Sequence, residues 1–381
     1  MTSSAPIKAG LSASLTGQFE TQGAQALAGL TAWADYVNEN GGLPVDGGQR
    51  PVALVHYDDG SMADNCRQNT ERLIRQDRVD LLFGPYSAGL TTAAADVANE
   101  HERLLWNHGG AGDALYARGH RNVIGVLTPA DRYLEGVLPL IRQVNPGANK
   151  AVILRIDTGA FARIAARTVE TAAEEMGFTI DLDLRYRPSQ FQFREIARHV
   201  GELGPDVVVA VGRIRHDIAA ARALAGLSNR NRIGMAVVVA APISEFAIAL
   251  GRSVDGFVGP SQWEPQVSVS TPDVGPPPGT VLQLMEHAGA ARSVPVDYPM
   301  AQAFASGLVV QRSLEEAGSV DENALRQAAG DLDFTTFYGR FRIDENGRQI
   351  GRSVALVQRQ EGRKVVVWPP EQAEAPLRHP F

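Results

Sequence analysis

The chain of 381 residues contains a single cysteine, Cys66, so no disulfide bond can form within it. It has no apolar run long enough to cross a bilayer. Basic residues are not in excess, because 36 Lys and Arg face 43 Asp and Glu, for a formal net charge of -7. Phosphate recognition needs a basic face, so this balance argues against nucleic acid as a main partner. The composition is otherwise typical of a globular protein with room for two domains.

The common cofactor motifs are also missing. The turn after the first predicted strand reads Leu15-Thr16-Gly17-Gln18, which is no dinucleotide-binding fingerprint, and no G-x-x-x-x-G-K-[ST] phosphate loop occurs. His101 and Glu102 begin like the H-E-x-x-H zinc motif, but Leu105 occupies the position of the second histidine. The other histidines show no ligand spacing. We therefore expect neither a cofactor nor a metal ion.

What the chain does contain is a regular alternation of strand and helix patterns, which is typical of the α/β class. The first half predicts one doubly wound unit. Its predicted strands are Ile7–Ala13, Pro51–Tyr57, Val79–Phe83, Arg103–Trp106 and Asn122–Leu127, and its predicted helices are Thr21–Asn40, Ala63–Gln76 and Leu90–His101.

The alternation then restarts and predicts a second doubly wound unit of the same kind. Its predicted strands are Lys150–Ile156, Thr179–Tyr186, Asp206–Val211, Ile233–Ala240 and Gly256–Pro260, and its predicted helices are Asp131–Val144, Phe161–Met176, Ser189–Leu203, Asp217–Leu227 and Ile243–Leu250.

A loop rich in Pro and Gly follows at 268–280. After it come three helical patterns and a tail that alternates like antiparallel strands. The helices are Val281–Ala288, Tyr298–Ala317 and Glu322–Ala329, and the strands are Gly339–Ile343, Arg352–Gln360 and Lys364–Trp368. The fold class is thus α/β, with two Rossmann-like lobes of parallel sheet. We assign 1–127 plus about 264–338 to lobe 1, and about 128–263 plus 339–381 to lobe 2.

The most informative stretch for function is 84–110. Two neighbouring strands each end in a loop of small residues, Gly84–Gly89 and Asn107–Gly110. Ligands of open α/β sheets usually bind at this carboxyl end of the strands. Amides at a helix N-terminus, beside the hydroxyl of Ser87, suit a carboxylate or another anion. Ser87 has an alternative role as a simple N-cap.

Other chemistry at these positions has little support. The strand–turn–helix around Ser87 has the geometry of a nucleophile elbow, but Pro85 stands where the G-x-S-x-G pattern requires glycine. Asp58-Asp59-Gly60 is more typical of a turn than of a cation site. Cys66 lies on a helical pattern and is expected to be a small buried residue. We expect no enzyme, and keep a hydrolase that uses Ser87 as a remote alternative.

Taken in order, several segments resemble the leucine/isoleucine/valine-binding family of type I periplasmic binding proteins, which serve ABC transporters. The resemblance covers nearly the whole chain. The segments that carry it are IKAGLSASLTGQFETQGAQALAGL (7–30), YVNENGGL (36–43), VHYDDGS (55–61), GPYSAGLTTAAADVANE (84–100), WNHGGAGDAL (106–115) and FYGRFRIDENG (337–347).

The resemblance implies two α/β lobes joined by a hinge of three crossings, with a small ligand enclosed between them on closure. It implies capture of an amino acid or an organic, possibly aromatic, acid and delivery to an ABC permease, without chemistry. We expect a monomer that is not inserted into the membrane. The N-terminus, MTSSAPIKAG, has neither the basic start nor the apolar core of a signal peptide. Either a leader was removed from a periplasmic or extracellular protein, or the chain is a cytoplasmic or receptor-linked sensor of the same fold.

In the first lobe the family binds the ligand's α-carboxylate with hydroxyl groups and main-chain amides of the third- and fourth-strand loops. In this sequence Ser87 and Ala88 follow the third strand, and Ala88 falls at the main serine position of the family. The fourth-strand loop offers Gly109, Gly110 and Ala111, and Ala111 stands where a threonine is expected. The resemblance therefore predicts a site made largely of main-chain amides.

In the second lobe the resemblance places Phe161 where an aromatic ring covers the ligand. A second aromatic position of the family falls near Arg213 or Ile214, and Arg213 follows the strand DVVVAVG together with Arg215 and His216. A guanidinium group there could bind an acid through two hydrogen bonds, or could belong to a solvated basic loop. Aromatic residues of lobe 1 complete the expected site: Phe19, Tyr86 and Tyr298, with Trp106 either lining it or packed in the core.

Overall fold

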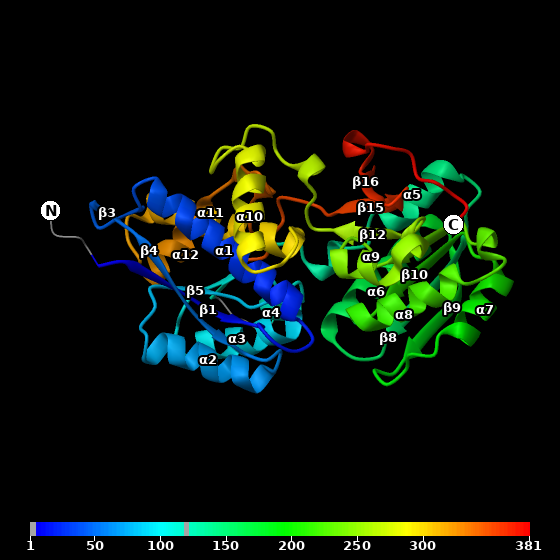
Figure 1. Ribbon diagram of the computed structural model, residues 1–381, viewed down its shortest axis with the longest axis horizontal. Helices are drawn as coiled ribbons and strands as arrows, with labels where there is room; N and C mark the ends of the chain where they lie inside the picture. The colour runs from blue at the N-terminus through cyan, green and yellow to red at the C-terminus, as the bar shows by residue number, and fades with distance from the viewer. Residues whose placement is uncertain (1–4, 118–121) are drawn as a thin grey trace. The chain divides into compact units, whose positions relative to one another are not determined.

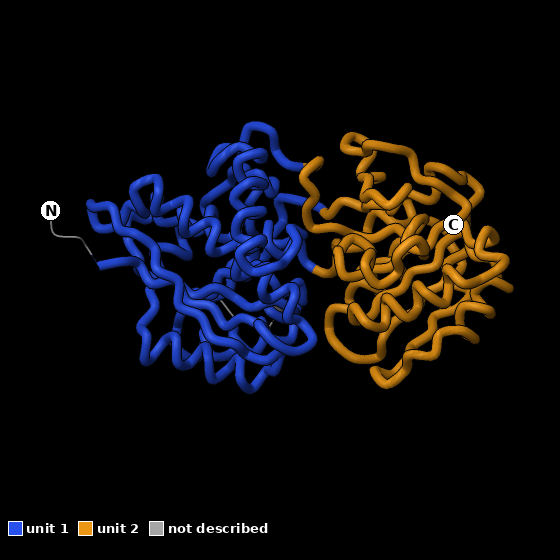
Figure 2. Tube along the Cα trace, in the orientation of Figure 1, with its two compact units in different colours: residues 1–129, 268–353 blue, residues 130–267, 354–381 orange. Residues whose placement is uncertain are grey.

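The computed structural model describes residues 5–117 and 122–381, which form two compact units. Unit 1 comprises residues up to 129 together with 268–353, and unit 2 comprises 130–267 together with 354–381 (Figure 2). The first four residues, which belong to the N-terminus considered above for a leader, lie outside the described part. Each unit is an α/β layer structure of its own (Figure 1).

Unit 1 is built on a parallel sheet with the strand order β4-β1-β5-β6-β7. The interior strand β1 pairs along its whole length with β4, from Ile7 opposite Val52 to Ala13 opposite Asp58. β1 is buried at all but one position, as is typical of an interior parallel strand, whereas β4 at the edge is partly exposed. The strands are β1 Ile7–Ala13, β4 Val52–Asp58, β5 Leu81–Phe83, β6 Leu105–Asn107 and β7 Val123–Gly125, and two small hairpins add β2 Leu43–Val45, β3 Gly48–Arg50, β13 Phe334–Thr336 and β14 Gly339–Phe341.

Helices cover both faces of this sheet (Figure 1). On one face α1 packs against α10 and α11, and on the other α2 packs against α3. Glycine lets α1 and α11 approach closely, because a Cβ atom at Gly307 would lie 2.2 Å from the Trp33 ring. The helices are α1 Glu20–Glu39, α2 Ala63–Arg75, α3 Ala88–Glu100, α4 Ala114–Ala117, α10 Pro278–Ala291, α11 Tyr298–Ala317 and α12 Glu322–Asp331.

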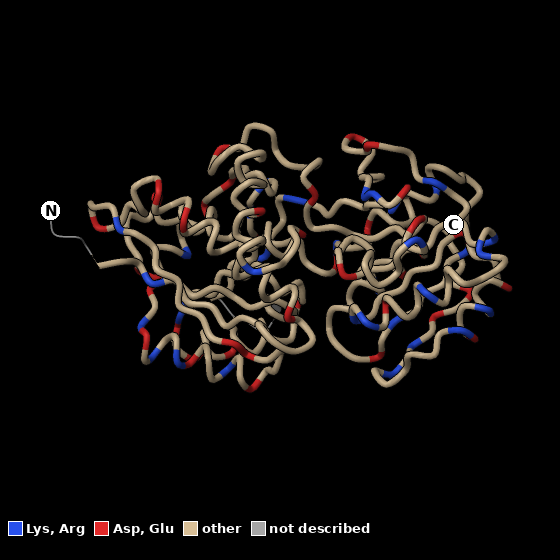
Figure 3. Tube along the Cα trace, viewed as in Figure 1, with Lys and Arg blue, Asp and Glu red and all other residues tan. Residues whose placement is uncertain are grey.

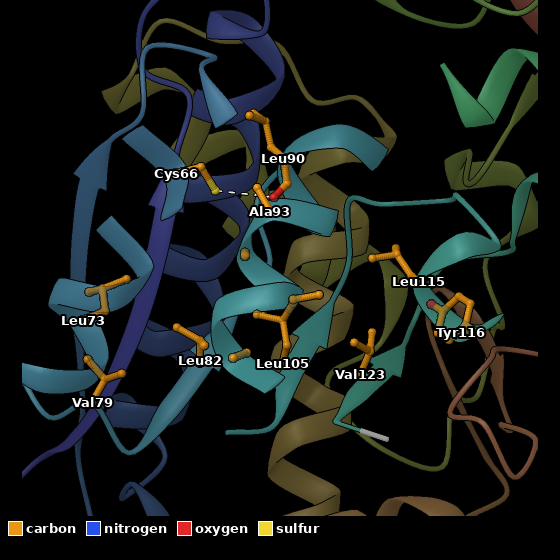
Figure 4. Packing of buried hydrophobic residues seen from close by; sticks show 13 residues of the cluster. Cys66, Leu73, Val79, Leu82, Leu90, Ala93, Leu105, Leu115, Tyr116 and Val123 are labelled. Atoms are coloured by element: carbon orange, nitrogen blue, oxygen red, sulfur yellow. Dashed lines mark hydrogen bonds between the residues drawn. The ribbon is translucent and has the colours of Figure 1, made fainter. Parts of the chain in front are cut away.

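A cluster of buried apolar side chains fills the space between the sheet and the helices α2 and α3 (Figure 4). Cys66 lies within it, and its thiol contacts the main-chain oxygen of Leu90 at 3.5 Å. Burial raises the pKa of this thiol to about 12, so it stays protonated and unreactive. Cys66 is therefore a small core residue, as the sequence predicted.

Unit 2 is built on one mixed sheet with the order β16-β15-β12-β11-β10-β8-β9. The strands β9, β8, β10, β11 and β12 run parallel, and the late hairpin β15–β16 pairs antiparallel at the edge of β12. The strands are β8 Lys150–Ile156, β9 Thr179–Tyr186, β10 Val207–Val211, β11 Met235–Val238, β12 Val258–Ser261, β15 Ala355–Gln360 and β16 Arg363–Trp368. The helices are α5 Val137–Val144, α6 Ala160–Met176, α7 Arg194–Leu203, α8 Ile214–Ala225 and α9 Ser244–Leu250.

Charged residues of both signs are interspersed over each unit (Figure 3). Within residues 5–117 and 122–381, no helix is long and apolar enough to cross a membrane.

The structure differs from the sequence expectations at a few places. Helix α7 begins at Arg194. A turn from Arg187 to Gln190, closed by the Gln190 amide on the Arg187 carbonyl at 2.9 Å, and an irregular segment to Phe193 precede it. The hairpin β2–β3 was not expected, since its strands are too short to show a period. The segment 339–353 groups with unit 1, whereas the sequence boundaries placed it in lobe 2. Hydrogen bonding of the Gly125 amide to the Gly347 carbonyl ties this segment to β7.

Candidate functional site

The loops after β5 and β6 lie against each other at the carboxyl end of the unit 1 sheet. The Gly84 amide donates to the Trp106 carbonyl at 2.9 Å, and the Ser87 amide donates to the Gly109 carbonyl at 3.0 Å. No side chain could fit at Gly109, because a Cβ atom there would lie 2.3 Å from the Pro85 carbonyl oxygen. The small residues singled out in the sequence therefore allow these two loops to touch.

Asn107, at the end of β6, organises the second loop. It is fully buried, and its Oδ1 accepts hydrogen bonds from the Gly109 and Gly110 amides at 3.1 and 2.8 Å. Its Nδ2 donates to the Gly110 carbonyl and to the Tyr116 hydroxyl. The two glycine amides that we expected to face a ligand are thus already bonded within the protein. An Asn two residues before a glycine pair is a sequence signal for such a turn.

Ser87 is the N-cap of α3. Its Oγ accepts a hydrogen bond from the Leu90 amide at 3.4 Å, and its carbonyl accepts one from the Thr91 amide at 3.0 Å. Its φ of 86° is rare for a residue with a side chain, and such strain is common at functional loops. The capping role is therefore present in the structure, and direct contact of this hydroxyl with a ligand stays a prediction.

Three main-chain amides near Ser87 remain available. Among the described residues, the amides of Ala88, Gly89 and Ala111 donate to no protein acceptor. The first two open the 13-residue helix α3, whose N-terminus carries a partial positive charge. Gly112 places the second loop beside them, because a Cβ atom there would lie 3.2 Å from the Ala88 Cβ. This arrangement is suited to an anion.

Aromatic side chains meet around Tyr86, which precedes Ala88 by two residues. The rings of Phe19 and Tyr86 meet edge to face with centroids 5.8 Å apart, and the hydroxyls of Tyr86 and Tyr298 lie 3.2 Å apart. All three side chains are half-buried. The structure thus brings together residues that the sequence separates by up to 279 positions, the distance from Phe19 to Tyr298. Trp106, by contrast, is fully buried and belongs to the core.

Asp58 ties the first-strand loop in place. Its carboxylate accepts hydrogen bonds from the amides of Leu15, Thr16 and Gly60 and from the Thr16 hydroxyl. Burial tends to raise the pKa of this group, but the hydrogen bonds from Gly60, Thr16 and Leu15 outweigh it and lower the pKa. The carboxylate is therefore committed to main-chain amides, which supports the turn that the sequence predicted.

Asp59 holds the adjacent segment that leads to Phe19. Its carboxylate accepts hydrogen bonds from the hydroxyls of Ser12 and Ser14 and from the Ser61 amide, and burial raises its pKa. Ser61 Oγ in turn accepts a hydrogen bond from the Phe19 amide at 3.0 Å. This chain of contacts fixes the aromatic ring at the start of α1.

His108 was not singled out by the sequence. It lies between Asn107 and Gly109 and is fully buried, with main-chain groups of His108 itself and of Gly84 beside its ring. Burial lowers its pKa to about 4, so the imidazole is neutral near pH 7. Its position between Asn107 and Gly109, in a loop predicted to bind the ligand, is the sequence signal that could have marked His108 as a candidate.

In unit 2, Phe161 opens helix α6 at the carboxyl end of β8. It is half-buried and packs edge to face on Tyr133, with ring centroids 5.1 Å apart. The neighbouring Asp157 amide donates to the Tyr186 carbonyl at 2.8 Å, which links the β8 and β9 loops.

Arg213 is the N-cap residue of α8 and follows β10, an interior strand of the unit 2 sheet, by two residues. Its side chain is exposed and forms no ion pair with any described residue. Arg215 is also exposed. His216, expected beside them at the ligand end, is buried instead: it bonds the Pro188 carbonyl and stacks on Phe191 with centroids 4.3 Å apart. Only the two arginines thus project from this loop.

No group of three or more His, Cys, Asp or Glu side chains in the described segments is placed to hold a metal ion. The carboxylates of Asp58 and Asp59 accept hydrogen bonds from main-chain amides and hydroxyl groups of the protein.

Comparison with known proteins gives relatives along nearly the entire chain. A Leu/Ile/Val-binding protein of Rhizobium johnstonii, BraC3, is 24% identical over 378 residues, which covers 95% of this chain and 94% of that protein.

Solved structures share the fold at low sequence identity. A solute-binding protein of an ABC transporter from R. palustris, in complex with benzoate, aligns with a TM-score of 0.75 at 18% identity and covers 95% of both chains. The branched-chain amino acid binding protein LivJ of Streptococcus pneumoniae, in complex with isoleucine, aligns with a TM-score of 0.77 at 17% identity and covers 94% of this chain and 97% of that one. These matches confirm the predicted fold of two parallel-sheet α/β lobes.

The family model described as periplasmic binding protein matches residues 6–364. The resemblance found in the sequence is thereby confirmed, and this chain belongs to the periplasmic binding protein family.

Proposed function

We propose that this chain is the solute-binding component of an ABC transporter and captures a small carboxylic acid with an apolar or aromatic body. The observation that carries this proposal is the set of three available amides, from Ala88, Gly89 and Ala111, next to the ring of Tyr86. Amides at a helix N-terminus bind a carboxylate without a cationic side chain. The family of the chain and the benzoate complex of the R. palustris protein support this function.

The proposed ligand also touches unit 2. We assign an aromatic contact with the ligand to Phe161. We assign an ionic contact with the ligand's carboxylate to Arg213, whose exposed guanidinium has no protein partner among the described residues. A ligand that contacts both units binds the closed conformation more tightly than the open one. This difference in affinity between the two conformations is the proposed mechanism. No covalent step is required, so the protein acts by binding and release to a permease outside the cytoplasm.

An acid with an aromatic or branched apolar body fits better than a polar amino acid. Alanine occupies both positions, Ala88 and Ala111, where the resemblance predicts hydroxyl donors, and the surrounding side chains are the rings of Phe19, Tyr86 and Tyr298. The loss of hydroxyl donors weakens recognition of a polar head group, whereas ring surface favours apolar burial.

The Ser87 hydroxyl is not arranged for nucleophilic catalysis. Its Oγ accepts from the Leu90 amide and is paired with no histidine or carboxylate among the described residues. A nucleophile needs an adjacent base.

The test is isothermal titration of the purified protein with benzoate, 4-hydroxybenzoate and isoleucine, with benzamide as the neutral control. The proposal predicts one-to-one binding of at least one acid, and binding of benzamide that is at least tenfold weaker than that of benzoate. If none of the three acids bound, the proposal would be refuted.

A further inference from the structure

A buried carboxyl group, Asp217, lies in the first turn of α8 and one helical turn after Arg213. It is 1% exposed, and its Oδ2 accepts a hydrogen bond from the Ala240 amide at 3.1 Å. Its own amide donates to the Arg213 carbonyl at 3.0 Å. Asp217 therefore joins the loop after β10 to the loop after β11, at the carboxyl end of the unit 2 sheet.

The other oxygen of Asp217, Oδ1, lies against the main chain of Gly212, whose amide contact lowers the pKa but does not offset burial. The hydroxyl of Tyr186 has no hydrogen-bond partner among the described residues. Both oxygens converge on Gly212, since a Cβ atom there would lie 2.3 Å from the Tyr186 hydroxyl and 2.6 Å from Asp217 Oδ1. Gly212 is the residue directly before Arg213, so these two contacts fix the main-chain position from which Arg213 extends.

Two titratable side chains lie beside Asp217. Tyr186 approaches from β9, and His216 follows from α8 itself, where its Nε2 is hydrogen bonded to the Pro188 carbonyl. The loop after β11 contributes the main-chain amide of Ala240. Burial among such groups strongly disfavours the ionised carboxylate of Asp217. The neutral acid is favoured, because it has no charge to desolvate and its proton can reside on Oδ1.

We propose that Asp217, held as a neutral acid, is the positioning residue that fixes the Gly212 main chain and so presents Arg213 to the ligand's carboxylate. This inference rests on the proposed function, in which Arg213 contacts the acid. Ionisation of Asp217 would weaken binding in two ways: it would loosen the packing at Gly212, and it would place a negative charge one turn from the residue that meets an anion. Burial raises the pKa of Asp217 to about 8, which puts this change within reach of an ordinary titration.

The experiment measures the affinity for benzoate, which stays ionised throughout, between pH 7 and pH 9. With a titration near pH 8, the wild type is expected to lose affinity by about tenfold over this range. Asp217→Asn, which keeps an acceptor for the Ala240 amide and cannot ionise, should bind with no such dependence. Asp217→Ala should bind more weakly at every pH, because that amide loses its partner.

Asp206→Asn is the matched control. Asp206 stands at the other end of β10 and also accepts main-chain hydrogen bonds, from the Asn149 and Lys150 amides at 2.8 and 2.9 Å. Its substitution should leave the pH profile as in the wild type. A flat wild-type profile, or one that persists in Asp217→Asn, would overturn the inference while leaving the proposed function in place.

Hydrogen exchange of the ligand-free protein gives a second readout that does not depend on binding. After correction for intrinsic rates, amides of 212–216 should lose protection between pH 7 and pH 9 in the wild type and keep it in Asp217→Asn. Equal protection in both proteins would refute the positioning role. If the wild type binds no acid at pH 7, the proposed function fails, and this exchange measurement still decides whether Asp217 controls the loop.

Discussion

The hydroxyl oxygens of Tyr86 and Tyr298 lie 3.2 Å apart, although 212 positions separate the two residues in the sequence. The first follows β5 and the second opens α11, so the contact joins the two sequence segments that make up unit 1. With Phe19 against Tyr86, it forms the aromatic side of the proposed ligand site.

This hydroxyl contact should contribute measurably to stability. Tyr86→Phe and Tyr298→Phe are each expected to lower the free energy of unfolding by about 0.5–1.5 kcal/mol, the usual net value of a hydrogen bond. Because the two hydroxyls bond each other, the double variant should lose less than the sum of the single ones. Chemical denaturation of the four proteins measures this coupling. Strict additivity would show that the two hydroxyls do not interact.

Ser87 offers a test of main-chain recognition. Ser87→Ala removes the cap on the Leu90 amide and should cost about 0.5–2 kcal/mol of stability. Ser87→Gly also removes the hydroxyl, but it suits the φ of 86°, so its cost should be smaller. Both variants should lose at most about 1.5–3 kcal/mol of binding free energy for benzoate, the value of one hydrogen bond to a charged group. Complete loss of binding in both would place the Ser87 hydroxyl, not the amides, at the centre of recognition.

Arg213 is the side chain on which we expect an acid ligand to depend most. Arg213→Ala should leave the fold intact, since the exposed side chain makes no ion pair with a described residue, and should weaken benzoate binding by about 2–5 kcal/mol. Arg213→Lys should restore only part of the affinity, because an ammonium group cannot form the planar pair of hydrogen bonds. Arg215→Ala is the matched control, with an exposed arginine two positions along. Equal effects of the two alanine variants would mean that Arg213 is one of several solvated charges.

The raised pKa of Asp217 also predicts how stability depends on pH. The folded protein holds this proton up to about pH 8, whereas the unfolded chain releases it near the ordinary value of about 4. The folded state then binds more protons, so stability falls as pH rises, by at most about 1.4 kcal/mol per pH unit. His108 acts in the opposite direction, but only below about pH 6.5, since its folded pKa is about 4.

Unfolded histidines still titrate between pH 6.5 and about pH 7.5, so the difference between the wild type and Asp217→Asn isolates Asp217. Chemical denaturation from pH 6.5 to pH 8 should show the stability of the wild type declining relative to that of Asp217→Asn. Parallel curves for the two proteins would mean that the carboxyl group is already ionised in the folded state.

The sequence predicted most of the fold because buried parallel strands leave a clear signal. Ile7–Ala13, Lys150–Ile156 and Thr179–Tyr186 are strands with the bounds expected, and Tyr298–Ala317 is a helix with the bounds expected. The start of α7 was misplaced because a turn from Arg187 to Gln190 takes up the first residues of the predicted helix, and the helix begins only at Arg194.

The site was predicted less completely, for a physical reason. The position of Ser87 and the closeness of the two loops follow from local patterns. The competition for amides was missed, although an Asn two residues before a glycine pair is a local signal for it. Asn107 takes the amides of Gly109 and Gly110, and this depends on one side chain folding back onto its own loop. The meeting of Tyr86 with Tyr298 depends on how distant segments pack, which no local pattern in a single sequence contains.

The central claim is that the chain binds an organic acid through main-chain amides and ring surface, without turning it over. The most direct test is isothermal titration of the wild type at pH 7 with benzoate and with benzamide, followed by chromatographic recovery of the ligand. We predict one-to-one binding of the acid, binding of the amide at least tenfold weaker, and recovery of the acid unchanged. Binding of the amide as tight as that of the acid, or a chemically altered ligand, would contradict the account.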